Sequence, residues 1–274
     1  MLIVAAVPIG NSLDVTEHLK LQLRTSKYVI AEDSRKFHRL CSDLKIETNA
    51  KVFSFFDGNE NEILEQLTEL IKSHDVLLVS DAGTPGINDP GYRLIRAAIT
   101  NNVKLQVLPG PSAVLMSLLL SGLPTDRFCF EGFAPRTQTA RQKWFEQLST
   151  EERTIVFFEA PHRLAESLAD AAQVLGDDRL GAVCREMTKQ YEETIRGSIS
   201  ELLNWSKQNE VLGEVTVVLS GFDPKSAAIN ESEVVARVKA AENGGLSRKS
   251  AIAVVAKDLS LPKRIVYELM IENK

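Results

Sequence analysis

Short apolar runs alternate with amphipathic stretches along most of this chain, and this alternation limits the possible fold more than any other feature. An apolar run of roughly four to eight residues fits a strand buried on both faces, and an amphipathic stretch fits a helix that covers the sheet. Val76–Val79 is the clearest such run. Repeated units of this kind predict the α/β class, with a largely parallel sheet and helices on both faces.

The first half of the chain follows this pattern up to Pro109–Ser112, which cannot continue a strand. We therefore expect a first α/β domain over residues 1–112. The helix expected over Ala113–Leu120 is apolar on nearly every side, which predicts that it is buried. The expected strands are Leu2–Val7, Tyr28–Ala31, Val52–Phe56, Val76–Ser80 and Leu105–Leu108, and the expected helices are 14–24, 34–44, 60–73 and 90–101.

The second half repeats the alternation and predicts a second α/β domain over residues 113–225. The apolar runs at 180–185 and 192–196 lie too close together for a helix between them, so we expect antiparallel neighbours and a mixed sheet. The expected strands are Phe128–Phe133, Thr154–Glu159, Leu180–Arg185, Glu192–Arg196 and Val215–Ser220, and the expected helices are 139–148, 161–175 and 198–208.

A helical extension is expected over residues 230–274, after a linker at 222–230. Its helix-like stretches are 231–241, 247–258 and 262–272, and the last two resemble a helix-turn-helix. A helical cap without a nucleic-acid role fits the same pattern. The extension carries a net charge of +2, against −7 for residues 1–229.

The composition excludes several other classes. The 274 residues are 44% apolar and 25% charged, as in an ordinary globular protein. No run is long and apolar enough for a membrane span, and the N-terminus lacks the basic start of a signal peptide. The three cysteines are odd in number and far apart, and the histidines lack the H-E-x-x-H spacing. We therefore expect no disulfide framework, no metal and a cytoplasmic location.

Several loops stand at the carboxyl ends of predicted strands, where open α/β sheets bind ligands. These loops are 7–11, the glycine-rich 80–91 and 109–113. They lack both G-x-G-x-x-G and the Walker A pattern. Polar clusters follow other strands at 32–35, 159–163 and 185–193. Tight turns, helix caps and solvated ion pairs explain each segment as well, if it is taken alone.

Taken together, these segments resemble the tetrapyrrole-methylase superfamily, and within it the branch that methylates ribosomal RNA of the small subunit. The resemblance runs from about Leu2 to Lys274. It rests on PIGN at 8–11 with Asp14 and Thr16, AEDSR at 31–35, SDAGTPGINDPG at 80–91, PGPSA at 109–113, SGLPTDRF-x-FEGF-x-PR at 121–136, FEAPHR at 158–163 and RE-x-TK-x-x-EE at 185–193.

The resemblance implies two α/β domains with S-adenosyl-L-methionine held in a cleft between them, a homodimer, and 2′-O-methylation of a cytidine in 16S ribosomal RNA of the small ribosomal subunit. It also implies a set of positions that contact the cofactor, which are Pro8, Asp81, Thr84, Ser112, Ala113, Phe158 and Met187.

Methyl transfer to a ribose oxygen needs alignment of the two reactants, and a general base can assist it. Candidate bases at the strand ends are Lys189, Glu159, Glu186 and Asp33, which the sequence does not rank. Arginine forks suit RNA phosphates, and basic residues near helix starts strengthen such contacts. The expected RNA-binding residues are Arg35, Arg163, Arg185, Arg248, Lys249, Lys263 and Arg264.

Two other functions stay open. One is methylation of a small molecule such as a porphyrinoid, as in other branches of the superfamily. The other is a non-enzymatic RNA-binding protein of ribosome assembly. The basic extension argues against the first, and the cofactor-type loops argue against the second.

Overall fold

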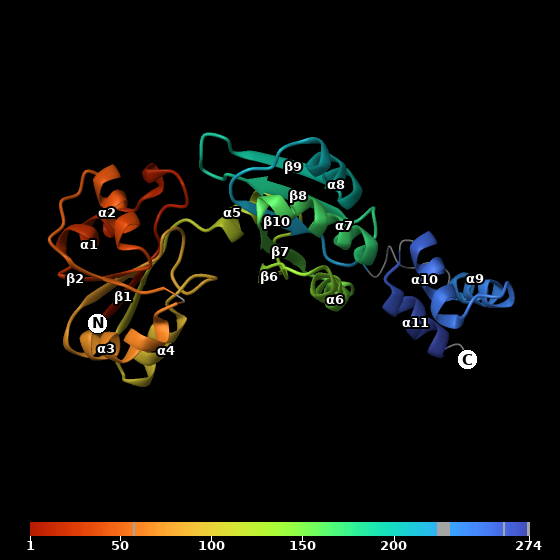
Figure 1. The fold of residues 1–274 in the computed structure, drawn as a ribbon, viewed down its shortest axis with the longest axis horizontal. Coiled ribbons are helices and arrows are strands. Elements are labelled where there is room, and N and C mark those ends of the chain that lie inside the picture. Colours follow the sequence, from red (N-terminus) through yellow and green to blue (C-terminus); the bar gives the residue numbers. More distant parts are fainter. Residues whose placement is uncertain (57, 224–230, 260, 273–274) are drawn as a thin grey trace. The chain divides into compact units, whose positions relative to one another are not determined.

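The computed structural model describes residues 1–56, 58–223, 231–259 and 261–272, and Figure 1 shows its fold. The chain divides into two compact units, Met1–Ala113 and Val114–Lys274. Each of the two sheets has five strands, one sheet in each unit. The cofactor cleft between two domains that the resemblance implies stays a prediction.

The first unit alternates strands and helices as expected. Its strand order is β3-β2-β4-β1-β5 and every neighbouring pair is parallel, which confirms the predicted α/β sheet. Its elements are β1 (Leu2–Ala5), η1 (Ser12–Asp14), α1 (Glu17–Thr25), β2 (Tyr28–Ala31), α2 (Ser34–Asp43), β3 (Lys51–Ser54), α3 (Glu60–Ser73), β4 (Val76–Val79), α4 (Tyr92–Thr100) and β5 (Leu105–Leu108).

Both faces of this sheet are buried because alternate residues of each strand point to opposite sides. On β4, Leu77 and Val79 pack in a cluster with α1 and α2, whereas Val76 and Leu78 pack in another with α3 and α4. The central position predicted for residues 76–79 is confirmed, since β4 lies between β2 and β1.

The second unit contains the mixed sheet expected from the sequence. Its strand order is β6-β7-β10-β8-β9, in which only β6 and β7 are parallel neighbours. Its first helix, α5 (Ala113–Ser121), begins at the last residue of the first unit. Its other elements are β6 (Phe128–Phe133), α6 (Gln138–Leu148), β7 (Thr154–Glu159), η2 (Pro161–Arg163), α7 (Leu164–Leu175), β8 (Leu180–Arg185), β9 (Glu193–Ser198), α8 (Ile199–Gln208) and β10 (Val215–Leu219).

Helices cover both faces of this second sheet. The main core cluster joins one face to α6, α7 and α8, while Val114 and Leu118 of α5 pack against Val156 and Val218 on the other. Within the second unit, the expected burial of α5 is found on one side of the helix. Leu115 and Leu119 are 52% and 73% exposed, since only the face that carries Val114 and Leu118 packs on the sheet.

The C-terminal extension consists of α9 (Glu231–Asn243), α10 (Arg248–Asp258) and α11 (Lys263–Glu272). Its apolar residues form a cluster of their own, which includes Val234, Val255 and Val266. The side chain of Ser247 caps α10 by accepting a hydrogen bond from the Ser250 amide. Part of the linker predicted over 222–230, namely residues 224–230, lies outside the described residues.

Candidate functional site

Three of the predicted ligand loops meet at the carboxyl edge of the first sheet. The Val7 amide donates to the Gly83 carbonyl over 2.8 Å, and the Gly83 amide donates back over 3.2 Å. This bridge also ends β1 two residues earlier than expected. The third loop reaches the same place, because a side chain on Gly110 would lie only 2.8 Å from the Ala6 Cβ. Glycine at that position therefore permits the close approach.

This meeting point is also where the helix connections change sides. The chain leaves β1 for α1 on one face of the sheet, and it leaves the adjacent β4 for α4 on the other face. Open α/β sheets bind ligands at such a switch point, outside the carboxyl ends of the strands. The topology therefore supports the loops at 7–11 and 80–91 as parts of a ligand site.

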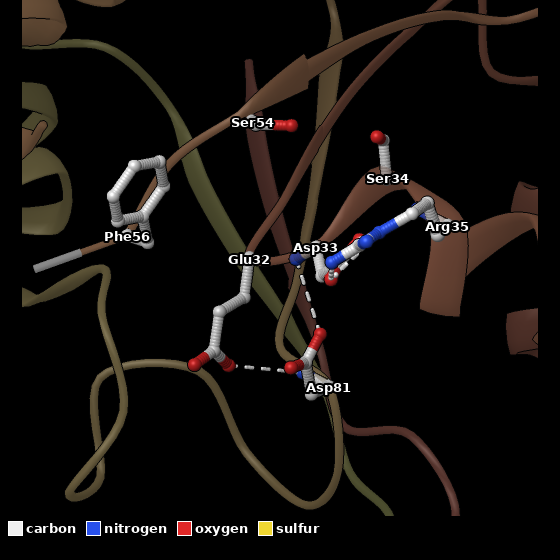
Figure 2. Close-up of a pocket in the computed structure, with 7 residues that line it drawn as sticks. All are labelled: Glu32, Asp33, Ser34, Arg35, Ser54, Phe56 and Asp81. Carbon is white, nitrogen blue, oxygen red and sulfur yellow. Dashed lines mark hydrogen bonds and ion pairs between the residues drawn. The ribbon is translucent and has the colours of Figure 1, made fainter. Parts of the chain in front are cut away.

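Asp81 connects the glycine-rich loop to the polar segment after β2 (Figure 2). Its carboxylate accepts from the Asp33 amide over 3.1 Å, and its own amide donates to Glu32 over 3.2 Å. Lys36 lies 2.8 Å from the other oxygen of Asp81. The sequence-predicted contact of Asp81 with a ligand therefore competes with bonds inside the protein, and Asp81 positions the two loops.

A cavity of about 450 Å³ opens beside this network. It is rich in carboxylate and hydroxyl oxygens, which suits a ligand with positive charge or several donors. Glu32, Ser54 and Phe56 were not assigned from the sequence, although Glu32 stands in the AEDSR motif and could have been found there. The lining residues are Glu32, Asp33, Ser34, Arg35, Ser54, Phe56 and Asp81 (Figure 2).

Asp33 and Arg35 form an ion pair in the lining of this cavity. Both carboxylate oxygens of Asp33 accept hydrogen bonds from the Arg35 guanidinium. That side-chain hydrogen bond, with one from the Arg35 amide, holds the pKa of Asp33 well below its usual range. A carboxylate held in this way is a poor proton acceptor, so the geometry weighs against Asp33 as a base.

The polar strand ends of the second unit lie in one row at the edge of its sheet. Val215 of β10 pairs with Glu159 of β7 on one side and with Arg185 of β8 on the other. Arg185 pairs in turn with Glu193 of β9 and forms an ion pair with it over 2.7 Å. The tertiary structure thus brings together two motifs that are far apart in the sequence.

Glu159 is almost fully buried, with 2% of its surface exposed. One oxygen lies 2.5 Å from the Arg163 guanidinium and accepts from the Ala160 amide, while the other accepts from the Ser167 hydroxyl. Arg163 itself keeps only 15% of its side chain exposed. This buried ion pair is suited to a structural role more than to proton transfer or to binding RNA.

Glu186 and Lys189 form a second ion pair, in a loop with unusual backbone. Glu186 and Thr188 have φ angles of 51° and 67°, which are strained for residues other than glycine. One Glu186 oxygen accepts from Lys189 over 2.8 Å and from the Glu214 amide over 3.0 Å. Gly213 fits against this carboxylate, where any side chain would collide with it.

The contacts of Glu186 and Lys189 shift the pKa of each residue so that its charged form is favoured. Burial alone would lower the pKa of Lys189, but its bonds to Glu186 and Glu214 outweigh that effect and raise the pKa. Burial would likewise raise the pKa of Glu186, yet Lys189 and the Glu214 amide bring it below its usual value. Lys189 therefore carries a proton near neutral pH, which argues against its use as a base.

The expected cofactor residues divide between the two units. Pro8, Thr84 and Ser112 belong with Asp81 and Ala113 to the first unit. Phe158 and Met187 belong to the second, where Phe158 packs edge-on against Phe130 and Phe133, and Met187 is 7% exposed. Contact of the cofactor with each of these two sets of residues stays a prediction.

The RNA-binding residues expected in the extension differ in their partners. Arg248 donates to the Met270 carbonyl over 2.8 Å and so ties α10 to the end of α11, while Arg264 pairs with Glu268. Lys249 and Lys263 are exposed and have no polar partner among the described residues. The two lysines are therefore the ones free to meet an anion.

Thiol and metal chemistry have no evident centre in the described ranges. Cys41, Cys129 and Cys184 are all buried, and burial raises the pKa of Cys41 and of Cys129 to about 11. Within the described residues, no group of three or more histidine, cysteine or acidic side chains has a metal-binding arrangement. No helix in those ranges has the length and apolar character of a membrane span.

Comparison with known proteins assigns the family. Residues 1–203 match the family of tetrapyrrole (corrin/porphyrin) methylases. A relative from Mycobacterium bovis, named ribosomal RNA small subunit methyltransferase I, is 42% identical over 275 aligned positions, which cover 100% of this chain and 95% of the relative. The chain belongs to the tetrapyrrole methylase family. Within it, the chain is a methyltransferase of the ribosomal RNA small subunit methyltransferase I group, as the resemblance in the sequence indicated.

Solved structures support the fold. The methyltransferase CobJ has a TM-score of 0.61 at 14% identity, covering 80% of this chain and 93% of its own. Uroporphyrin-III C-methyl transferase from Thermus thermophilus, complexed with S-adenyl homocysteine, has a TM-score of 0.54 at 18% identity, covering 80% and 96%. At these identities the likeness establishes the shared fold.

Proposed function

We propose that this methyltransferase transfers a methyl group from S-adenosyl-L-methionine to the ribose 2′-oxygen of a cytidine in 16S ribosomal RNA. The observation that carries the proposal is full-length similarity, at 42% identity, to a ribosomal RNA small subunit methyltransferase I. The polar edge of the first sheet is proposed to bind the cofactor, and the polar edge of the second sheet is proposed to bind the RNA. The enzyme acts in the cytoplasm, as a homodimer, on the small ribosomal subunit.

The edge of the first sheet suits the cofactor. S-adenosyl-L-methionine supplies the methyl group when bound, and its sulfonium and ammonium groups are cationic. The cavity beside Asp81 is lined by the carboxylates of Glu32, Asp33 and Asp81. Arg35 and Lys36 pair with the last two, so the carboxylates outnumber the cations by one and favour positive charge. A solved relative of the same fold is complexed with the demethylated product. The proposed cofactor contacts are Pro8, Asp81, Thr84, Ser112, Ala113, Phe158 and Met187.

Among the four candidate bases, Glu186 fits proton transfer best. Both oxygens of Asp33 and of Glu159 are already hydrogen bonded, and Lys189 carries its proton. One oxygen of Glu186 has no hydrogen-bond partner in the described part of the chain. The lowered pKa makes Glu186 a weak base, as it does Asp33, so the choice of Glu186 rests on this oxygen and not on basicity. Lys189 then holds the carboxylate in place.

The extension is proposed to dock RNA. Its separate apolar cluster indicates that the sheets of both units keep their cores without it. Lys249 and Lys263 lie near the starts of α10 and α11, where helix ends already favour phosphate. We therefore keep the three-part division into residues 1–112, 113–225 and 230–274 as part of the proposal.

The experiment is a map of 2′-O-methyl marks on 16S ribosomal RNA from cells with and without this protein. One cytidine should lose its mark without the protein and regain it when purified protein and S-adenosyl-L-methionine are added to small subunits. An unchanged map would contradict the proposal. A chain truncated after Asp223 should still bind the cofactor and should lose most of this methylation.

Methylation of a porphyrinoid is the second candidate, because a structural relative is named for uroporphyrin-III. That relative is only 18% identical, whereas the ribosomal RNA methyltransferase matches at 42% over the whole chain. A transfer assay with uroporphyrinogen as acceptor should therefore show no product.

A further inference from the structure

The turn that follows β6 holds a basic residue that no assignment above has used. This turn comprises Ala134, Pro135 and Arg136, and it lies at the same edge as Glu159, because the Ala134 amide donates to the Phe158 carbonyl over 3.1 Å. A β-bulge precedes it, where the pairing of β6 with β7 shifts between Phe130 and Phe133. Bulges often redirect a strand end beside a functional site.

Two arginines, the buried Arg141 and the partly buried Arg163, contact the backbone of this turn. Arg163 donates to the Ala134 carbonyl over 3.5 Å, and Arg141 donates to the carbonyls of Pro135 and Arg136 over 3.4 and 3.5 Å. Three successive carbonyls are therefore bound by guanidinium groups. These bonds are long for N–H···O contacts, and together they restrain the backbone of this short segment.

Each of these arginines is anchored on a buried carboxylate. Arg163 pairs with Glu159, and Arg141 pairs with Asp170 over 2.7 Å, with both side chains of the latter pair at most 4% exposed. Gln138 and Gln142 donate to the remaining oxygen of Asp170. The anchors lie on β7 and α7, so the turn is fixed to the body of the second unit.

Arg136 stands on this fixed turn with its side chain exposed. The other arginines and lysines described at this edge are all paired, since Arg163 binds Glu159, Arg185 binds Glu193, and Lys189 binds Glu186 and Glu214. Arg136 has no hydrogen-bond or ion-pair partner for its side chain in the part of the chain that the structure describes. Arg136 can therefore bind an anion without first breaking another ion pair.

The neighbouring side chain indicates which kind of anion. Phe133 is 56% exposed and rests edge-on against Phe158, with ring centres 5.5 Å apart. Single-stranded RNA is recognised by stacking of bases on aromatic rings together with arginine contacts to phosphate. An exposed ring three residues before an unpaired arginine offers both contacts. A free phosphate ion would use only the arginine.

We propose that Arg136 and Phe133 form a nucleotide-binding site, in which Arg136 binds a backbone phosphate of the substrate RNA and Phe133 stacks on a base. This proposal rests on the proposed action on ribosomal RNA. Arg141 and Arg163 are positioning residues that fix the turn. The site places a stretch of single-stranded RNA at the edge that also carries Glu186.

The test compares Arg136→Ala with Arg127→Ala. Arg127 directly precedes the same strand, at the opposite end, and is also exposed, so the two variants lose the same charge. Affinity for purified 16S ribosomal RNA is measured across a salt series. Arg136→Ala should bind roughly tenfold more weakly, as for a lost bond to a charged group, and its salt slope should fall by about 0.7, as for one lost phosphate contact. Arg127→Ala should match the wild type.

Further arms separate the alternatives. Phe133→Leu should weaken RNA binding without changing the salt slope, and inorganic phosphate at equal ionic strength should not displace the RNA. Cofactor affinity and melting temperature should stay unchanged in Arg136→Ala. Equal RNA affinity of Arg136→Ala and Arg127→Ala would overturn the proposal, and so would a parallel loss of melting temperature. If the wild type neither binds nor methylates this RNA, the proposed function itself fails.

Discussion

The carboxylates at the polar edges of the two sheets have different bonding partners. At the edge of the first sheet, the carboxylates of Glu32 and Asp81 accept from backbone amides and line a cavity. At the edge of the second, Glu159 and Asp170 bind the guanidinium groups of Arg163 and Arg141, which in turn hold a turn of the backbone.

This difference indicates a division of tasks. Carboxylates that hold loops around a cavity create a negative, ligand-sized site, which suits a small cationic cofactor. Buried ion pairs create a rigid surface that presents a few chosen side chains, which suits a large anionic substrate.

Glu186→Gln tests the chemical role of the second edge. Removing a general base should lower turnover by about 10²- to 10⁴-fold, because the hydroxyl proton loses its acceptor. Cofactor affinity, measured by calorimetry, should change little. Glu210→Gln is the control, since Glu210 is exposed in the loop before β10. Full activity of Glu186→Gln would remove Glu186 as the base.

Arg141→Ala tests the rigid anchor. It leaves Asp170 buried without its cation, which should lower the free energy of unfolding by about 3–5 kcal/mol. Arg153→Ala breaks the more exposed pair with Glu151 and should lower the free energy of unfolding far less. Denaturant unfolding measures both. Similar losses in the two variants would mean that the Arg141–Asp170 pair does not anchor the second unit.

Asp81→Ala tests the cavity of the first edge. The variant loses the acceptor for the Asp33 amide and for Lys36. We expect cofactor binding to weaken by roughly 1–3 kcal/mol, the effect typical of a donor left without its acceptor. Asp43→Ala removes an exposed carboxylate from α2 and serves as the control. Wild-type affinity in Asp81→Ala would show that the cofactor binds elsewhere.

The smallest effect is a pH dependence from the Glu186–Lys189 pair. The pKa of Glu186 is lowered from 4.5, so its contribution is complete above that pH and is lost as pH falls through the lower folded value. The pKa of Lys189 is raised from 10.5, so its contribution is complete below that pH and is lost as pH rises through the higher folded value. The stability difference between wild type and Lys189→Ala should therefore be constant between these limits. A maximum of this stability difference near pH 4.5 or near pH 10.5 would contradict the assignment of the pair.

The sequence by itself determined the two α/β units and nearly all of their elements. Runs such as Val76–Val79 can be buried on both faces only in a covered sheet, and the short spacing from Arg185 to Glu193 leaves room only for antiparallel neighbours. These are local properties of composition and spacing, so they can be predicted without knowing the contacts. The motifs also located the loops of the site, because strand ends are recognisable in the sequence.

Only the tertiary structure decided which of those polar residues are free to act. Glu159 and Glu186 have the same chemistry and similar motifs, but Glu159 is enclosed by Arg163 and Ser167, while Glu186 keeps an oxygen without a partner among the described residues. The same holds for Arg163 and Arg136, one buried in an ion pair and the other exposed. Availability depends on partners contributed by other strands and helices. Such partners follow from the packing of distant segments, which residue type and spacing along the chain do not specify.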